Sequence, residues 1–254
     1  TLHAAWGVVS NALAKIAESE QYAPGAAGQP SLEALLAQLD QLAGSAYPVG
    51  SETEEGDSIG WGNWDVRVYA ASGYMALARK FWSADMLPRL QRMLWDPVAT
   101  VRLQIAQSLN TLWEVARPEM WQMVEAVVER EAHLGVLGFF LAGPMGRLTG
   151  ADPTRCVVLF TRVLARVPVR EMGETRWRET LSQAMANAAG YLWLNRGDVT
   201  TGWKPSTIAV VGAKVLRTFV NSVAAAVVLD GATFAGLVTS GVGAAMTVDV
   251  TAST

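Results

Sequence analysis

The stretch "DPVATVRLQIAQSL", residues 96–109, combines a helix start with an arginine beside an apolar stripe. Asp96 is an N-cap acceptor, and Pro97 suits the first helical position, whose N–H has no helical partner. Apolar residues then recur at helical spacing, at Val101, Ile105 and Leu109. Arg102 lies next to this stripe, where a guanidinium is tolerable only when it is paired and hydrogen-bonded. The stretch therefore predicts a buried helix with a structural ion pair.

A second copy of this pattern lies earlier in the chain. Arg67 and Arg102 each follow the first valine of an apolar stripe, and the two copies are 35 positions apart. The stripes have the same internal offsets, Val66, Ala70, Tyr74 and Leu77 against Val101, Ile105, Leu109 and Leu112. Each copy is followed by another helical segment, "SADMLPRLQRMLWD" and "RPEMWQMVEAVVERE". Helix pairs repeated at about 35 to 45 residues predict an α-solenoid.

Helical spacing of apolar residues dominates the first 200 residues, whereas the alternation typical of strands is rare. Two amphipathic helices are expected before the repeats, the second with Ser31 as its N-cap. Pro118 and Asp152-Pro153 mark further helix starts. We divide the chain into N-terminal helices at 1–45, a loop at 46–63, helical repeats at 64–200 and a capping region at 201–254.

The segment "LPRLQRMLWDPVATVRLQIAQSLNTL", residues 87–112, resembles a HEAT repeat, a unit of the armadillo-type folds. The matching positions are Leu87, Leu90, Leu94, the Asp96-Pro97 turn and the Val101-Arg102 pair. A further copy lies at Asp65, Val66 and Arg67. The resemblance implies an all-α protein, a right-handed α-solenoid of HEAT-like helix pairs.

In HEAT proteins the recurring arginines and aspartates form a ladder between adjacent repeats. The resemblance implies this structural role for Asp65, Arg67, Asp96 and Arg102. It also implies that the second helix of each pair lines a concave face. The polar residues expected there are Arg89, Arg92, Gln122, Glu125, Arg162 and Arg166. Their charges alternate in sign from pair to pair, which suits a polar protein or peptide surface better than a phosphate track.

The stretch "SAYPVGSETEEGDSIGWGN", residues 45–63, is predicted as an acidic Gly/Ser-rich loop. Its carboxylates do not follow the alternating spacing of a calcium loop. Long loops are uncommon in compact domains and are often binding elements. Trp61 and Trp64 lie in or beside it among glycines, and exposed aromatic residues commonly anchor partners. We therefore add both tryptophans to the candidate binding residues.

The composition limits the function classes. The chain has 254 residues, of which 51% are hydrophobic and 17% charged, which predicts a folded protein with a large core. A net charge of -3 supplies no general attraction for nucleic acid or an anionic membrane. The lone Cys156 lies in an apolar run, which favours a buried thiol and a reducing cytoplasm. We expect a buried helix rather than a membrane span in the apolar region 206–247, because charges interrupt it.

No arrangement typical of catalysis stands out. The sequence has no phosphate-binding glycine loop, and His3 and His133 are far apart in the chain. We expect no metal, no cofactor and structural histidines. The leading hypothesis is a non-enzymatic cytoplasmic scaffold that binds a protein, a peptide or flanking domains of a longer chain. The alternative is a HEAT-like enzyme that binds DNA and excises bases. Its candidate aromatic, acidic and basic residues are Trp113, Glu114, Trp177 and Arg178.

Overall fold

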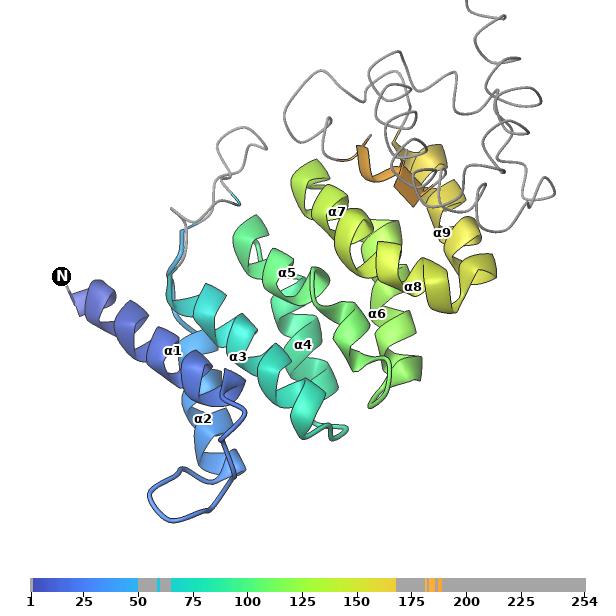
Figure 1. Cartoon of the computed structure of the whole chain (residues 1–254). Coiled ribbons are helices and arrows are strands. Elements are labelled where there is room, and N and C mark those ends of the chain that lie inside the picture. Colours follow the sequence, from blue (N-terminus) through green and yellow to red (C-terminus); the bar gives the residue numbers. More distant parts are fainter. Residues whose placement is uncertain are drawn as a thin grey trace, which may run out of the picture. The chain divides into compact units, whose positions relative to one another are not determined.

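The structure, a computed structural model, is helical in every element that it describes (Figure 1). The described residues are 2–49, 59, 65–167, 181, 183–185 and 187–188. The elements in chain order are α1 (Leu2–Glu18), α2 (Leu32–Ala43), α3 (Val66–Lys80), α4 (Met86–Leu94), α5 (Ala99–Ala106), η2 (Leu109–Leu112), α6 (Arg117–Arg130), α7 (Leu134–Phe140), η3 (Leu141–Met145), α8 (Gly146–Ala151) and α9 (Pro153–Arg166). The expected all-α class is thus confirmed for this part of the chain.

The contacts divide the chain into two compact units, residues 1–140 and 141–254. In the first unit α1 packs on α3, α3 on α5, and α5 on α7, so these helices form one row (Figure 1). A second row contains α2, α4 and α6 (Figure 1). In that row α2 contacts α1 and α3, α4 contacts α3 and α5, and α6 contacts η2. The first-row helices α1, α3 and α5 are thus followed in the chain by the second-row helices α2, α4 and α6.

Helix α3 lies at the centre of this unit and is buried along most of its length. The apolar stripe that the sequence predicted is at most 1% exposed at Val66, Ala70, Tyr74 and Leu77. Gly73 allows the neighbouring helices to come close. A Cβ atom there would lie 3.1 Å from both δ carbons of Leu39 on α2. A larger residue at this position would therefore push α2 away from α3.

Local capping chemistry fixes several helix starts as predicted. Ser31 caps α2 by accepting the N–H of Ala34 at 3.1 Å. Asp152 caps α9 by accepting the N–H of Arg155 at 3.1 Å. Pro118 lies in the first turn of α6, where its missing N–H costs nothing.

The predicted start of α5 at Asp96-Pro97 is wrong. The helix begins at Ala99, and Val98 is its N-cap residue. Asp96 Oδ1 instead accepts the N–H of Val98 at 2.8 Å, which makes a tight turn outside the helix. Aspartate forms such turns readily because its short side chain reaches the backbone two residues ahead. The turn leaves the rest of the carboxylate free to bind another group.

The second unit contains η3, α8, α9 and a few described residues between 181 and 188. Pro144 lies in the π-helical turn η3. Helix α9 is amphipathic and buries Cys156, Leu159, Phe160 and Val163. The predicted capping region at 201–254 lies outside the described residues.

One helical stretch within the described residues, Leu134–Ala151, is long and apolar enough to cross a membrane by length and composition. The structure buries 61% of this window. A buried core helix passes the same test, so the stretch is weak evidence for a membrane span. The apolar region 206–247 lies outside the described residues.

Candidate functional site

Arg67 forms a buried ion pair with Asp96. Its Nε donates to Asp96 Oδ2 at 2.8 Å, and its Nη2 donates to Oδ1 at 3.0 Å. Both residues are 7% exposed. The remaining Nη1 donates to the carbonyl oxygen of Ser45 at 2.8 Å. One arginine on α3 thereby holds the turns that follow α2 and α4.

Arg102 repeats this arrangement one pair later. Its Nε and Nη2 donate to the carboxylate of Glu131, both at 2.9 Å. Its Nη1 donates to the carbonyl oxygens of Asp96 at 2.9 Å and Pro97 at 3.0 Å. The two arginines are 35 positions apart, and so are the carboxylates of Asp96 and Glu131. We call these two ion pairs the rungs.

Each carboxylate of a rung also holds its own turn. Glu131 Oε1 accepts the N–H of His133 at 2.8 Å, just as Asp96 accepts that of Val98. Glu131 was not among the predicted ladder residues, because a glutamate without a following proline does not match the Asp-Pro pattern. Its position 35 residues after Asp96 is the signal that identifies it. Asp65, predicted as a ladder member, lies at the start of α3 and accepts the N–H of Val66.

Arg89 and Arg92, predicted as binding residues, both contact α2, and Arg89 is half-buried whereas Arg92 is exposed. Arg89 Nε and Nη2 donate to the carboxylate of Asp40, both at 2.9 Å. Arg92 donates to the carbonyl oxygen of Ala43 at 3.0 Å. The hydrogen bond from Arg89 holds the pKa of Asp40 below its ordinary value. Tyr74 also donates to Asp40, and burial raises the pKa of this phenol.

A groove between α4 and α6 contains the predicted residues Gln122 and Glu125. We call it the α4/α6 groove; its volume is about 270 Å³. The other residues that line it are Gln91, Leu94, Trp95, Met123, Ala126, Glu129 and Arg130. Trp95 is 37% exposed. The guanidinium of Arg130 lies 5.6 Å from its ring centroid, within the range of a cation–π contact.

The structure brings only part of the predicted binding set together. Arg162 is exposed and Arg166 is half-buried on α9, which belongs to the second unit. Trp61, Trp64 and the acidic residues of the loop lie outside the described residues, as do Trp177 and Arg178 of the alternative hypothesis. Trp113 is described, and the guanidinium of Arg117 lies 4.1 Å over its ring centroid.

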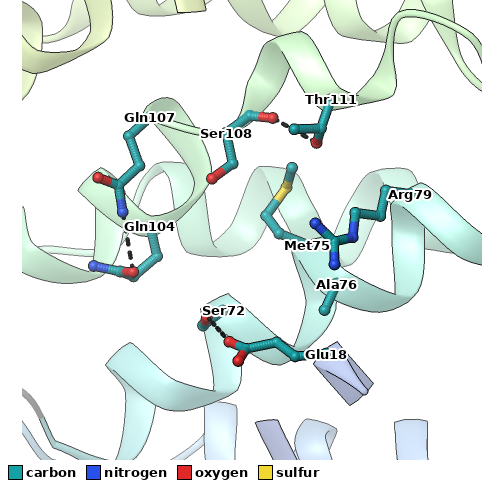
Figure 2. A pocket seen from close by; sticks show the side chains of 9 residues that line it. All are labelled: Glu18, Ser72, Met75, Ala76, Arg79, Gln104, Gln107, Ser108 and Thr111. Carbon is teal, nitrogen blue, oxygen red and sulfur yellow. Dashed lines mark hydrogen bonds between the residues drawn. The ribbon is translucent and has the colours of Figure 1, made fainter. Parts of the chain in front are cut away.

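A pocket that the sequence did not predict lies on the first row of helices (Figure 2). We call it the first-row pocket; its volume is about 390 Å³. It is lined by Glu18, Ser72, Met75, Ala76, Arg79, Gln104, Gln107, Ser108 and Thr111. These residues come from α1, α3, α5 and the start of η2, so their proximity depends on packing and has no local sequence signal.

The described residues contain no group of three or more His, Cys, Asp or Glu side chains that could hold a metal ion. His133 is buried, and its Nδ1 accepts the N–H groups of Gly135 at 3.2 Å and Val136 at 3.3 Å. This contact satisfies donors in the first turn of α7, which is a structural role. The side chain of His3 is outside the described set.

The chain was compared with protein-family models, curated proteins and solved structures. No family model, curated protein or solved structure matches this chain. The functional assignments that follow therefore depend on this chain's own residues and on its internal repeat.

Proposed function

We propose that this chain is a non-enzymatic scaffold, a right-handed HEAT-like α-solenoid that binds a protein or peptide segment. The observation that carries the proposal is the α4/α6 groove. It places the exposed ring of Trp95 among amide and carboxylate side chains on the second row of helices. The partner is a separate protein or another domain of the same polypeptide, and the protein is cytoplasmic.

The chemistry of the α4/α6 groove suits a peptide segment. The amides of Gln91 and Gln122 both donate and accept hydrogen bonds, as an extended peptide backbone requires. Trp95 supplies a large apolar surface that loses little conformational entropy on binding. Glu125 and Arg130 add both signs of charge at the rim, which favours specificity over non-specific attraction.

The ion pairs around the groove support a pre-organised surface. The carboxylate of Asp96 directly follows Trp95 and is held by Arg67 and by its own turn. Glu131 directly follows Arg130 and is held in the same way by Arg102. A surface whose ends are fixed before binding loses less entropy when a partner arrives. On this proposal Trp61, Trp64, Arg162 and Arg166 stay candidate partner contacts in their own parts of the chain, apart from the α4/α6 groove.

The test is a selection of peptides from a displayed random library against the full chain, followed by calorimetry with the enriched peptide. We expect Trp95→Ala to weaken binding by about tenfold or more, because truncating a central aromatic typically has this effect. Glu125→Gln should weaken it less. Val115→Ala is the matched control, because Val115 is an exposed apolar residue outside the groove.

Two results would overturn the proposal. One is that no enriched peptide binds the full chain, and the other is that Trp95→Ala and Glu125→Gln bind as tightly as the unmodified chain. Binding of duplex DNA that weakens steeply with added salt would favour the DNA-directed alternative, because phosphate contacts release counterions.

A further inference from the structure

The first-row pocket contains Arg79, whose guanidinium makes no hydrogen bond to the part of the chain that the structure describes. Within the described residues, the one ionic contact of Arg79 is with Glu20, at 3.8 Å from its Nη2. Both side chains are well exposed, at 40% and 89%. Figure 2 shows the guanidinium of Arg79 turned toward the middle of the pocket. An exposed pair at this distance contributes little, so the guanidinium is available for a ligand.

An amide pair occupies the other end of the pocket, on α5. Gln104 is 4% exposed, and its amide is held by the carbonyl oxygen of Thr100 at 3.3 Å. Its own oxygen accepts the side-chain N–H of Gln107 at 3.2 Å. Gln107 is exposed, so its amide oxygen and second N–H remain available. A positioned amide with one free donor and one free acceptor matches the two polar groups of a peptide bond.

An apolar surface separates these two ends. Met75 lies between Arg79 and the glutamines in Figure 2, and the neighbouring Ala76 also lines the pocket. Both residues are at most 5% exposed, so they form a floor rather than a projecting contact. Methionine adapts to apolar groups of different shapes. The floor therefore suits a small or medium apolar side chain.

The charge balance around the pocket favours an anion. Glu18, the one carboxylate among the described residues that line it, is paired with Lys15 at 2.6 Å and accepts the Ser72 hydroxyl at 3.1 Å. Lys80 is close to the same place, because its Nζ donates to the carbonyl oxygens at the end of α1, that of Ser19 at 2.7 Å. The carboxylate of Glu18 is thus engaged by Lys15 and Ser72, and Lys80 adds a positive charge nearby. Arg79 is the charged group of the lining that makes no hydrogen bond within the described residues.

We propose that the first-row pocket binds the free C-terminal end of a peptide. The planar guanidinium of Arg79 suits the terminal carboxylate, to which it can donate two parallel hydrogen bonds. The last side chain then covers Met75 and Ala76, and a preceding peptide group meets Gln107. This site is separate from the proposed partner-binding function, because none of its residues lines the α4/α6 groove.

The experiment measures binding of short peptides to the full chain by calorimetry. The probes are acetyl-Ala-Ala-Val with a free carboxylate, the same peptide as its C-terminal amide, and acetyl-Ala-Asp-Ala-amide, which carries only a side-chain carboxylate. Inorganic phosphate is the fourth probe. We expect the free acid to bind on the order of tenfold or more tighter than the other three, because only it offers a carboxylate adjacent to both a peptide group and an apolar side chain.

Variants test whether the peptide binds in the first-row pocket. Arg79→Gln should weaken the free acid on the order of tenfold and remove its preference over the amide, and Gln107→Ala should weaken both peptides. Arg117→Gln is the matched control, since Arg117 is an exposed arginine outside the pocket, and it should bind like the unmodified chain. Circular dichroism checks that each variant is folded.

The inference is overturned if the free acid does not bind, or if the amide, the internal aspartate or phosphate binds equally well. It is also overturned if Arg79→Gln, while folded, binds the free acid as the unmodified chain does. Trp95→Ala serves to separate the two proposals, because it should weaken the partner peptide of the α4/α6 groove and leave the free acid unaffected.

Discussion

The rungs and the Arg89–Asp40 pair use the same chemistry in different surroundings. In each, a guanidinium donates two hydrogen bonds to a carboxylate, at 2.8 and 3.0 Å for Arg67–Asp96 and at 2.9 Å for both bonds of Arg89–Asp40. The side chains of the first pair are 9% and 6% exposed, whereas those of the second are 26% and 39% exposed. Geometry alone therefore does not rank the pairs. Solvent access decides what removing one partner costs.

The largest effect is expected from Arg67→Ala. It leaves the buried carboxylate of Asp96 with only the Val98 N–H, and an unpaired buried charge typically costs about 3–5 kcal/mol. Urea unfolding at neutral pH measures the loss. The double variant Arg67→Met, Asp96→Asn is the control, because it removes both charges while asparagine keeps the turn. It should recover much of the stability, and a double variant no more stable than Arg67→Ala would show that charge burial is not the cause.

Arg102→Ala should have the second largest effect, a loss of about 3 kcal/mol in the free energy of unfolding, at the lower end of the same range. The side chain of Arg102 is 15% exposed, so water can reach its end of the pair more easily, although Glu131 is 2% exposed. Urea unfolding again provides the measurement. Unchanged stability in Arg102→Ala, together with loss of partner binding, would make Arg102 a binding residue and not a rung.

Arg89→Ala should have a smaller effect, below about 1 kcal/mol, because water and salt screen an exposed pair. A double-mutant cycle with Asp40→Asn isolates the interaction from other losses. Lys15 and Glu18 form a comparison pair on α1, with side chains 69% and 34% exposed. A coupling energy for Arg89–Asp40 as large as that of a rung would contradict the role given to burial.

Acid should reduce the contribution of the Arg89–Asp40 contact to the free energy of unfolding. The pKa of Asp40 is lowered in the folded chain, mainly by its hydrogen bond from Arg89. Its contribution to stability is therefore complete above the ordinary carboxyl pKa and is lost as the pH falls through the lower folded value. The stability difference between the unmodified chain and Asp40→Asn should shrink when unfolding is measured at about pH 3 instead of pH 7. A constant difference would contradict the lowered pKa.

Cys156 shows the effect of burial on a single titratable group, a thiol that should react slowly with thiol reagents in the folded chain. Burial raises the pKa of this thiol to about 11, and its side chain is fully buried on α9. Because the thiolate is the reactive form, a thiol reagent at about pH 8 should label the folded chain far more slowly than the urea-unfolded chain. Equal labelling rates in the two states would show that α9 opens readily.

The residues that sequence analysis placed correctly have local signals. Ser31 and Asp152 cap helices because their side chains reach N–H groups a few residues ahead. The 35-residue repeat identified Arg67 and Arg102 because a charge beside an apolar stripe has few tolerable explanations. The predicted all-α class follows from the same periodicity.

The residues that it missed depend on contacts between distant segments. The ion pair of Arg89 could not be predicted, because its partner Asp40 is 49 positions away and belongs to another helix. The lining of the first-row pocket combines α1, α3 and α5, which share no motif. Glu131 was missed for a different reason, because the expected residue type was aspartate although the spacing was correct.

The hydrogen bonds that Nη1 of each rung arginine makes to the backbone have a consequence for unfolding. Arg67 Nη1 binds the turn after α2 through Ser45, and Arg102 Nη1 binds the turn after α4 through Asp96. Asp96 is thus held by both arginines, through its carboxylate and its carbonyl oxygen. Opening either helix pair alone would break contacts that the other shares. Hydrogen exchange should therefore report α3 to α6 as one cooperative unit, with amides that become exchangeable together.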